Sequence, residues 1–365
     1  MALTLVPDLG GSRIKNLIEH CKTAEAVCKL PKGKLMKFPG VGEKIATAVV
    51  SANQQLSLAE KHINTHQKQG IEMLAYTDER YPDRLKDIKD APAILYHKGN
   101  TPLNRQKIIS IVGTRKATRY GLEATERLVE QLQKHDCLIV SGLAYGIDIA
   151  AHKAALKNGL DTIGVMANGM DRIYPAIHKK IATQMVEQGG LLTENPLGTK
   201  PDAPLFPARN RIIAGMCDAV VVVEAAKSGG ALITAEIANS YFKDVFAFPG
   251  DVNNPYSEGC NRLIRSHKAN LLIDVSDLEY HLGWEKSEAK SETKKVQEIN
   301  LPSLTEDERK VVTVLQEVDG LSLDELSWKS SVPANQLSGL LLNLEFQGVV
   351  SQHPGKQFRL SKALR

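Results

Sequence analysis

The sequence predicts an α/β protein built on a Rossmann-like, doubly wound parallel sheet, and two observations support this prediction. Short apolar runs alternate with helical stretches between residues 105 and 282. Near-continuous apolar strands are typical of parallel sheets that helices cover on both faces. Right-handed crossovers then place the carboxyl ends of these strands on one edge. The seven runs are KIISIVG, CLIVSG, DTIGVMANG, GLLTENP, AVVVVEAA, DVFAFPG and NLLIDV.

The N-terminal segment, residues 1–70, is predicted to be a separate helical domain. Two stretches, Val6–Ile18 and Phe38–Val50, each contain a proline, a glycine three positions later and an apolar helical run. Their prolines, Pro7 and Pro39, are 32 residues apart. Self-similarity at a fixed spacing indicates a structural repeat. We therefore expect a duplicated helix-hairpin-helix (SAM-like) domain.

Composition marks the remaining boundaries of the chain. Residues 71–100 are expected to form a lead-in with one short strand, AILYHKG, so that the core domain covers residues 71–283. Residues 285–300 hold four Lys and four Glu without an aromatic residue, which predicts a linker over residues 284–303. Residues 304–365 begin with a capping box, Thr305 and Glu308, and continue with two helical runs and a hairpin. This order predicts a winged-helix domain.

Net charge, the length of apolar runs and the spacing of cysteines limit the kinds of protein that this sequence can encode. The chain has 365 residues and a net charge of +4, so any nucleic-acid surface has to be a local patch. No apolar run approaches the length of a membrane span, and we expect a cytoplasmic protein with no membrane partner. The five cysteines are scattered and form no C-x-x-C motif, so we expect reduced thiols, no metal site and no cofactor.

Glycine-containing turns are expected along the carboxyl edge of the sheet, where open α/β sheets bind ligands. Glycine lets the backbone approach a ligand closely, and N–H groups at helix starts bind anions. Three such turns on one edge predict a site for more than one phosphate. The residues are Gly113, Thr114 and Arg115 in the first turn, Ser141 and Gly142 in the second, and Ser228, Gly229 and Gly230 in the third.

The segment FPARNR adds side chains suited to nucleic acid. Arg209 and Arg211 flank Asn210 just before an apolar helix, and the planar guanidinium group matches phosphate geometry. Phe206 is a candidate for stacking on a base. Arg172 and Lys200 are weaker candidates from the same edge.

A second phosphate site is expected in the N-terminal domain, where Gly40 and Gly42 form a tight turn beside Lys44. The other copy carries Asp8 and is degenerate. The winged-helix domain has seven Lys and Arg against eight Asp and Glu, and its expected recognition helix has no basic residue. Because groove binding depends on neutralising phosphates, we expect this domain to contact protein.

Some of these residues also suggest enzymatic alternatives. The dinucleotide fingerprint is missing, since Gly113 is followed by Thr114 and Arg115, and no acid ends the second strand. Asp148 and His152, four residues apart on one helix, are possible acid and base groups, with Glu236 as a third. A helix-capping role for Asp148 and a packing role for His152 are the commoner explanations. We expect no catalytic residues.

The motifs SIVGTR, VSGLAYGIDIAAH, FPARNRIIAG and SGGALITAEIA, in this order, closely resemble the DNA-processing protein A (DprA/Smf) family. The resemblance implies a protein that binds single-stranded DNA, forms a homodimer through the Rossmann-like domain and loads RecA recombinase. It also implies protection of incoming DNA during natural transformation. By motif, the DNA pocket would be lined by Arg115, Ser141, Gly142, Phe206, Arg209, Asn210, Arg211 and the turn at Ser228–Gly230.

One alternative stays open. The core also resembles the lysine-decarboxylase-like nucleotide phosphoribohydrolases, whose motif is P-G-G-x-G-T-x-x-E. Here SGGALITAE lacks the leading proline and the third glycine, but it keeps Glu236. Release of free base from nucleoside monophosphates, lost when Glu236 is changed, would favour this alternative.

Overall fold

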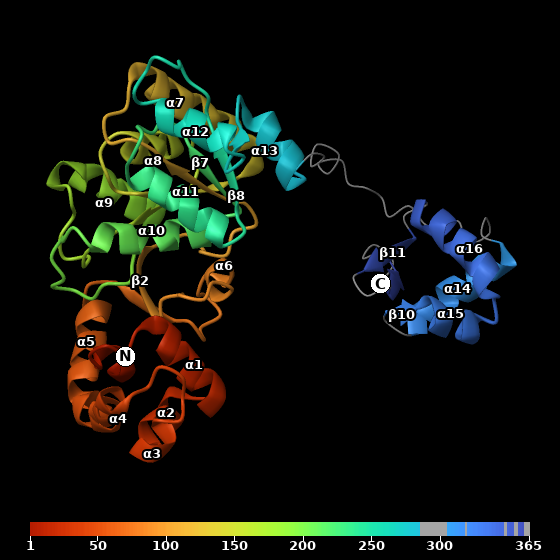
Figure 1. The fold of residues 1–365 in the computed structure, drawn as a ribbon, viewed down its shortest axis with the longest axis horizontal. Helices are drawn as coiled ribbons and strands as arrows, with labels where there is room; N and C mark the ends of the chain where they lie inside the picture. The colour runs from red at the N-terminus through yellow and green to blue at the C-terminus, as the bar shows by residue number, and fades with distance from the viewer. Residues whose placement is uncertain (285–304, 318–319, 347–348, 354–356, 361–365) are drawn as a thin grey trace. The chain divides into compact units, whose positions relative to one another are not determined.

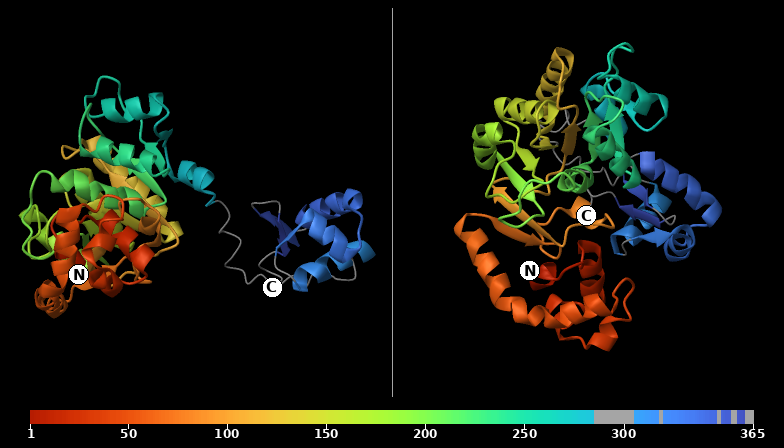
Figure 2. Two further views of the ribbon diagram at one scale, coloured as in Figure 1. Left: turned by 60° about the horizontal axis from the view of Figure 1, so that its bottom comes forward. Right: turned by 60° about the vertical axis from the view of Figure 1, so that its left-hand side comes forward.

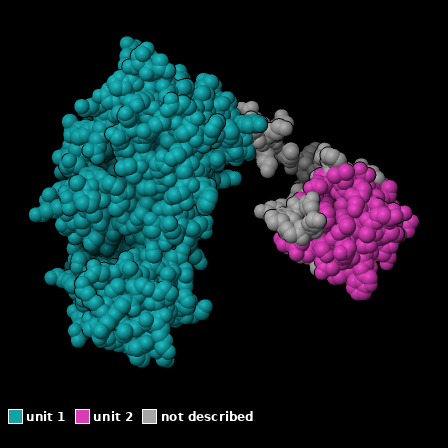
Figure 3. Space-filling model, in the orientation of Figure 1, with its two compact units in different colours: residues 1–285 teal, residues 286–365 magenta. Residues whose placement is uncertain are grey.

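The computed structural model describes the chain except for residues 285–304, 318–319, 347–348, 354–356 and 361–365. It divides into two compact units, residues 1–285 and 286–365 (Figure 3). Most of the expected linker, residues 284–303, lies outside the described residues. None of the five cysteines, all of which lie among the described residues, forms a disulfide. No helix among the described residues is both long enough and apolar enough to cross a bilayer.

The first unit contains a mixed sheet with the strand order β1-β2-β6-β5-β4-β3-β7-β8-β9 (Figure 1). Each of the seven predicted apolar runs forms one strand, and these seven strands pair in parallel. The Rossmann-like prediction is confirmed. The parallel strands are β3 (Ile108–Val112), β4 (Leu138–Gly142), β5 (Thr162–Val165), β6 (Gly189–Thr193), β7 (Ala219–Val222), β8 (Asp244–Ala247) and β9 (Asn270–Leu271).

The lead-in differs from the prediction, because it contributes two strands. β1 (Glu72–Ala75) pairs antiparallel with β2 (Ile94–Gly99), and β2 pairs antiparallel with β6. Leu74 and Leu95 face each other across the first pair, and both are buried. Leu74 is the one buried residue of β1, so its four residues show neither an apolar run nor a clear alternation in the sequence. The sheet is therefore antiparallel at one edge and parallel elsewhere.

Helices cover both faces of the sheet, as the apolar strands require (Figure 2). Alternate residues of β3 enter different cores: Ile108 and Val112 pack with α10 and α11, whereas Ile109 and Ile111 pack with α7 and α8. One face is covered by α6 (Asp83–Lys86), α10 (Leu205–Met216), α11 (Gly230–Ser240) and α12 (Glu258–Arg265). The other carries α7 (Arg119–Leu132), α8 (Ile147–Lys157) and α13 (Val275–Leu282), with α9 (Lys179–Glu187) on a smaller core beside β6.

The order of the strands fixes where a ligand can bind. From β3 the chain builds β4, β5 and β6 on one side, and then α10 returns it to β7 on the other side of β3. The crossovers diverge between β3 and β7, so this is the switch point of the sheet. A crevice is expected outside the carboxyl ends of these two strands.

The N-terminal residues are helical, and their two hairpins have matching backbones. Asp8 has φ 62° and Gly40 has φ 74°, each just before a helix of its own copy. Asp is one of the few residues other than glycine that tolerate this region. The helices are α1 (Gly11–Cys21), α2 (Ala24–Lys29), α3 (Lys32–Leu35), α4 (Glu43–Val50) and α5 (Leu56–Lys68).

The second unit has the predicted winged-helix elements. Thr305 and Glu308 form the expected capping box: the Thr305 amide donates to the Glu308 carboxylate at 2.8 Å, and the Glu308 amide donates to Thr305 Oγ1 at 3.3 Å. Strands β10 (Leu321–Ser322), β11 (Val350–His353) and β12 (Gln357–Leu360) form a small antiparallel sheet. The helices are α14 (Glu306–Glu317), α15 (Leu323–Ser330) and α16 (Ala334–Phe346).

A buried carboxylate that the sequence did not reveal holds the turn after β3. Glu224 is 1% exposed and accepts hydrogen bonds from the Thr118 amide at 2.8 Å and from Thr118 Oγ1 at 2.6 Å. Its backbone carbonyl accepts from the Thr114 amide at 2.7 Å. Thr118 is the N-cap of α7, so Glu224 fixes both ends of the turn that carries Arg115.

We predict that Glu224→Ala destabilises the first unit, because the partly buried amide and hydroxyl of Thr118 lose their acceptor. A loss of about 1–3 kcal/mol is expected for donors left without a partner. In a domain of this size that corresponds to a fall of roughly 2–10 °C in the thermal unfolding midpoint. The control is Glu236→Ala, an exposed carboxylate paired with Lys268, which should lower the midpoint by less than about 2 °C. Equal shifts in both variants would contradict this role.

Candidate nucleic-acid interface

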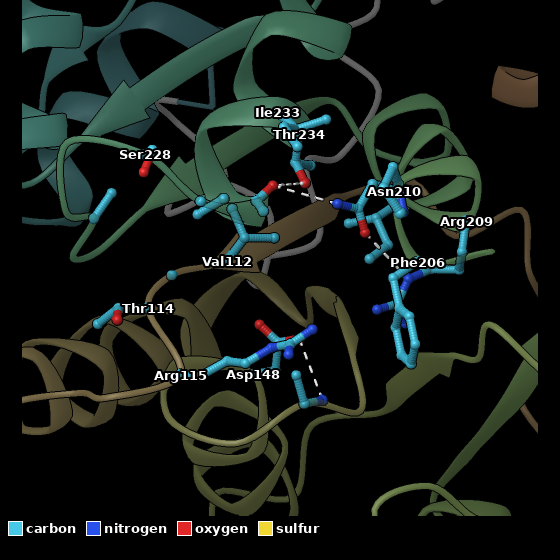
Figure 4. A pocket seen from close by; sticks show the side chains of 18 of the residues that line it. Val112, Thr114, Arg115, Asp148, Phe206, Arg209, Asn210, Ser228, Ile233 and Thr234 are labelled. Atoms are coloured by element: carbon cyan, nitrogen blue, oxygen red, sulfur yellow. Dashed lines mark hydrogen bonds between the residues drawn. The ribbon is translucent and has the colours of Figure 1, made fainter. Parts of the chain in front are cut away.

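A cavity of about 810 Å³ lies at the switch point between β3 and β7. Its walls come from the turn after β3, the turn before α11 and the first half of α10 (Figure 4). Thr114 and Arg115 lie on one side of the cavity, and Asn210 and Thr234 lie across from them. Two of the three predicted glycine turns therefore meet around one space.

The turn before α11 presents backbone to the cavity. Gly229 is the N-cap of α11 and has φ 152°, a conformation that residues with a β-carbon rarely adopt. Ser228, Gly229 and Gly230 all line the cavity. The N-terminus of an eleven-residue helix thus opens onto it, and its free N–H groups and dipole favour an anion.

Close packing between the turn after β3 and α8 requires glycine at position 113. A β-carbon there would overlap the side chain of Ile147, so the β3 turn and the start of α8 approach each other only because residue 113 is glycine. The turn continues with Thr114 and Arg115, which also line the cavity. The prediction that this turn faces the ligand crevice agrees with the geometry.

Arg115 is an exposed cation on the wall of the cavity, and the neighbouring Lys116 is a second one. The guanidinium carbon of Arg115 lies 5.6 Å from the centre of the Phe206 ring, a cation–π distance. The buried Asp148 carboxylate also lines the cavity and interacts electrostatically with Arg115. Within the part of the chain that the structure describes, no carboxylate forms a salt bridge with Arg115, so its guanidinium group is available to an anionic ligand.

Arg209 has a different position, in the floor of the cavity. Its side chain is buried, Nη1 donates to the Val165 carbonyl and Nε donates to Asn210 Oδ1 at 3.2 Å. Burial lowers the pKa of Arg209 to about 10, and the nearby Asp148 carboxylate opposes that shift. Burial likewise raises the pKa of Asp148, which Arg209 opposes. The two buried charges compensate each other beneath the cavity.

The second glycine turn lies below the floor rather than on the surface. Ser141 is fully buried and its hydroxyl donates to the Ile111 carbonyl at 2.5 Å. A β-carbon on Gly142 would collide with the Asp148 carboxylate and the Arg209 guanidinium. Neither residue lines the cavity. They support the buried charges, and their contact with a ligand stays a prediction.

Arg211 also departs from the expected arrangement. It donates to the Glu194 carboxylate and to the Asp90 carbonyl, the latter at 2.7 Å, and it does not line the cavity. The motif was expected just before a helix, but α10 already begins at Leu205. Successive residues of a helix point about 100° apart, so residues 209, 210 and 211 cannot share one face.

The remaining predicted residues divide between the wall and the surface. Asn210 lines the cavity and donates to the Gly230 carbonyl at 3.3 Å, which ties α10 to the α11 turn. Phe206 lines the cavity from the first turn of α10. Arg172 and Lys200 are exposed and lie outside its lining.

Two of the groups in the enzymatic alternatives, His152 and Glu236, do not line the cavity. His152 is buried between Thr162 Oγ1 at 2.7 Å and the Gly142 carbonyl at 2.6 Å, and burial lowers its pKa to about 4. Glu236 lies in the middle of α11, is exposed and pairs with Lys268 Nζ at 2.8 and 3.0 Å. It does not line the cavity, so the phosphoribohydrolase alternative lacks its acid there.

The sequence did not indicate Tyr174, which is 49% exposed and also lines the cavity. Its ring centre lies 5.8 Å from that of Phe206. The available signals were its position in the loop that follows β5, on the carboxyl edge of the sheet, and the candidate Arg172 two residues before it.

The second predicted phosphate site lies on the N-terminal helices. Gly40 and Gly42 form the hairpin before α4, and Lys44 Nζ lies 3.0 Å from Asp8 Oδ2 of the other hairpin. Residues 1–70 carry ten Lys and Arg against five Asp and Glu, whereas residues 71–284 carry 25 of each. The positive charge of the first unit is thus concentrated on its helical end.

Known proteins resemble the chain in sequence over nearly its whole length. Residues 72–283 match the family described as DNA recombination-mediator protein A, and residues 297–356 match the DprA winged helix domain. Protein Smf of Synechocystis is 31% identical, covering 98% of this chain and 97% of that protein. The DNA processing protein DprA of Streptococcus pneumoniae is 43% identical, covering 52% of this chain and 66% of that protein.

Two solved structures share the fold. DNA processing protein A from Streptococcus pneumoniae superposes with a TM-score of 0.68 at 33% identity, covering 76% of this chain and 95% of that one. DNA processing protein A from Helicobacter pylori, solved for its single-stranded DNA binding mode, has a TM-score of 0.53 at 30% identity and covers 59% of this chain and 96% of that one. The chain therefore belongs to the DNA recombination-mediator protein A (DprA/Smf) family.

Proposed function

We propose that this protein binds single-stranded DNA along the carboxyl rim of its parallel sheet. The observation that supports this most strongly is the open cavity at the switch point, where Arg115, the N-terminus of α11 and Phe206 meet. The Helicobacter pylori relative is described as binding single-stranded DNA, which supports the same ligand here.

The strand would be held mainly through its backbone. Phosphates would be bound by Arg115 and by the turns that contain Gly113, Gly229 and Gly230, which contain no base-reading pattern of donors and acceptors. Phe206 would contact a base through its ring face, and every base offers such a face. Binding should therefore tolerate sequence and weaken with salt.

Within the family's role, we propose that the chain is a non-enzymatic recombination mediator. It would protect incoming single strands, load RecA recombinase onto them and act in the cytoplasm as a homodimer joined through the Rossmann-like domain. The family resemblance supports these steps. The separation of Glu236 and His152 from the cavity also favours binding over catalysis.

We further propose that the N-terminal helices make a second, weaker contact with DNA. Lys34 and Lys37 are exposed and form no ion pair with any described residue, and they stand next to the hairpin of Gly40 and Gly42. Lysines beside a glycine hairpin suit contacts to phosphates of any sequence. The charge excess of residues 1–70 supports this second surface.

The first prediction concerns Arg115. Arg115→Ala should weaken binding to an oligothymidine by a similar factor for any sequence, because it removes a contact to phosphate. The slope of log affinity against log salt should fall by about 0.7, the value for one phosphate contact on a single strand. Fluorescence anisotropy at several salt concentrations measures both quantities. Arg80→Ala, which removes an arginine paired with Asp78 and Glu72, is the control and should leave the slope unchanged. An unchanged slope for Arg115→Ala would remove it from the interface.

A second prediction tests the mediator role. Adding the chain to single-stranded DNA coated with single-strand-binding protein should shorten the lag before RecA begins to hydrolyse ATP. Arg115→Ala should restore the lag, because a mediator has to hold the strand. A wild-type chain that binds the DNA but leaves the lag unchanged would rule out RecA loading while leaving DNA binding intact.

The third prediction separates the two DNA surfaces. The double variant Lys34→Ala and Lys37→Ala should lower the salt slope for duplex DNA by about 1.8, since each phosphate contact contributes about 0.9. Lys61→Ala with Lys68→Ala, on α5, removes the same charge from the same domain and is the matched control. If both pairs change the slope equally, the effect is one of net charge and the hairpin surface is not a specific contact.

A further inference from the structure

A buried histidine joins the N-terminal helices to the carboxyl edge of the parallel sheet. His66, in the last turn of α5, is 1% exposed, and its Nε2 accepts a hydrogen bond from the Leu197 amide at 3.2 Å. Leu197 belongs to the loop between β6 and α10, residues 194–204. Among the described residues, this is the one hydrogen bond between residues 1–70 and that loop. The helical domain thus holds a loop of the sheet through a single side chain.

The contacts of His66 determine which of its ring nitrogens carries the proton. A backbone N–H can only donate, so the Nε2 atom that faces the Leu197 amide is the acceptor. Nδ1 lies 2.7 Å from the His62 carbonyl, which can only accept, so Nδ1 is the protonated nitrogen. The ring also stacks on Tyr96 of β2, with centres 4.5 Å apart and planes inclined by 22°. The orientation of His66 is therefore fixed, with its acceptor aimed at the loop.

The loop between β6 and α10 forms part of the cavity wall. Residues 201–203 line the cavity, and the chain continues directly into α10, which carries Phe206. One residue after the contact with His66, the Gly198 amide donates to Asp171 Oδ1 at 2.8 Å. His66 and Asp171 thus hold the loop at two successive residues, just before it enters the wall.

The helical domain is also attached to the core at other points. Ser12 Oγ donates to the Lys89 carbonyl at 2.9 Å, and Lys15 Nζ donates to the Lys86 carbonyl at 2.6 Å. Both bonds reach the lead-in segment and neither reaches the loop between β6 and α10. A change at His66 should therefore release the loop while the helical domain stays in place.

We propose that His66 is a positioning residue for DNA binding, which holds the loop between β6 and α10 in the arrangement that a bound strand needs. The inference rests on the proposed single-stranded DNA binding and adds the N-terminal helices to the elements that set the shape of the cavity. A loop that is fixed before the ligand arrives loses less conformational freedom on binding, which raises affinity. His66 lies outside the cavity lining, so it acts through the loop.

The test changes two histidines of α5. His66→Phe keeps a ring that can stack on Tyr96 but leaves the Leu197 amide without its acceptor. It should weaken binding to an oligothymidine by about 2- to 10-fold, the factor that corresponds to one neutral hydrogen bond. It should also speed amide hydrogen exchange in residues 194–204. Fluorescence anisotropy measures the affinity, and mass spectrometry measures the exchange.

Two further variants separate the hydrogen bond from packing. His66→Gln should restore both the affinity and the slow exchange, because its side-chain oxygen can take the place of Nε2 as the acceptor. His62→Phe makes the same substitution one helical turn earlier, at a side chain that forms no hydrogen bond to any described residue of the loop. It is the matched control and should alter neither quantity.

The outcomes separate this role from DNA binding itself. Unchanged affinity in His66→Phe, or an equal loss in His66→Gln or in His62→Phe, would overturn the positioning role while leaving DNA binding in place. Faster exchange throughout the first unit would show a folding defect and would also overturn it. A wild-type chain that does not bind the strand would overturn the proposed function and with it the role in binding, whereas exchange in the free protein would still report whether His66 holds the loop.

Discussion

The reversal of the crossovers between β3 and β7 is the constraint on which the rest of the structure depends. Parallel strands joined by right-handed crossovers bring their carboxyl ends to one edge, and helices leaving a switch point diverge. The space between them is left open. Here it is bordered by the turns after β3 and β7 and by α10, which returns the chain across the sheet. The cavity is therefore a consequence of topology, and the side chains that line it determine which ligand would suit it.

The arginines near this cavity differ in role, because some are held by carboxylates of the protein and another is exposed. Arg209 is buried with Asp148, and each opposes the shift that burial imposes on the pKa of the other. A buried pair of this kind organises a floor, but it offers no charge to a ligand. Arg211 is held by Glu194 on another side of α10. Arg115 and the neighbouring Lys116 are left as exposed cations of the cavity, and the N-terminus of α11 opens onto the same space.

The seven apolar runs predicted the parallel strands because burial on both faces leaves an unmistakable pattern. The same reasoning placed Gly113 and Gly229 at the rim, since the ends of parallel strands share an edge. It missed β1, whose four residues are too few to show a period. It also predicted too many cavity-lining residues in the FPARNR segment. Residues that are adjacent in sequence point in different directions once α10 begins at Leu205. Tyr174 and Glu224 were missed because their roles arise from contacts with distant residues, Phe206 and Thr118.

Photochemical crosslinking of an oligonucleotide carrying 5-iodouracil tests the central claim most directly, since it reports which side chains touch the bases of a bound strand. Mass spectrometry of the crosslinked peptides should find them in the segments around Tyr174 and Phe206, on the carboxyl rim of the sheet. Crosslinks confined to residues 1–70 or to the winged-helix unit would contradict the account and place the strand elsewhere on the molecule.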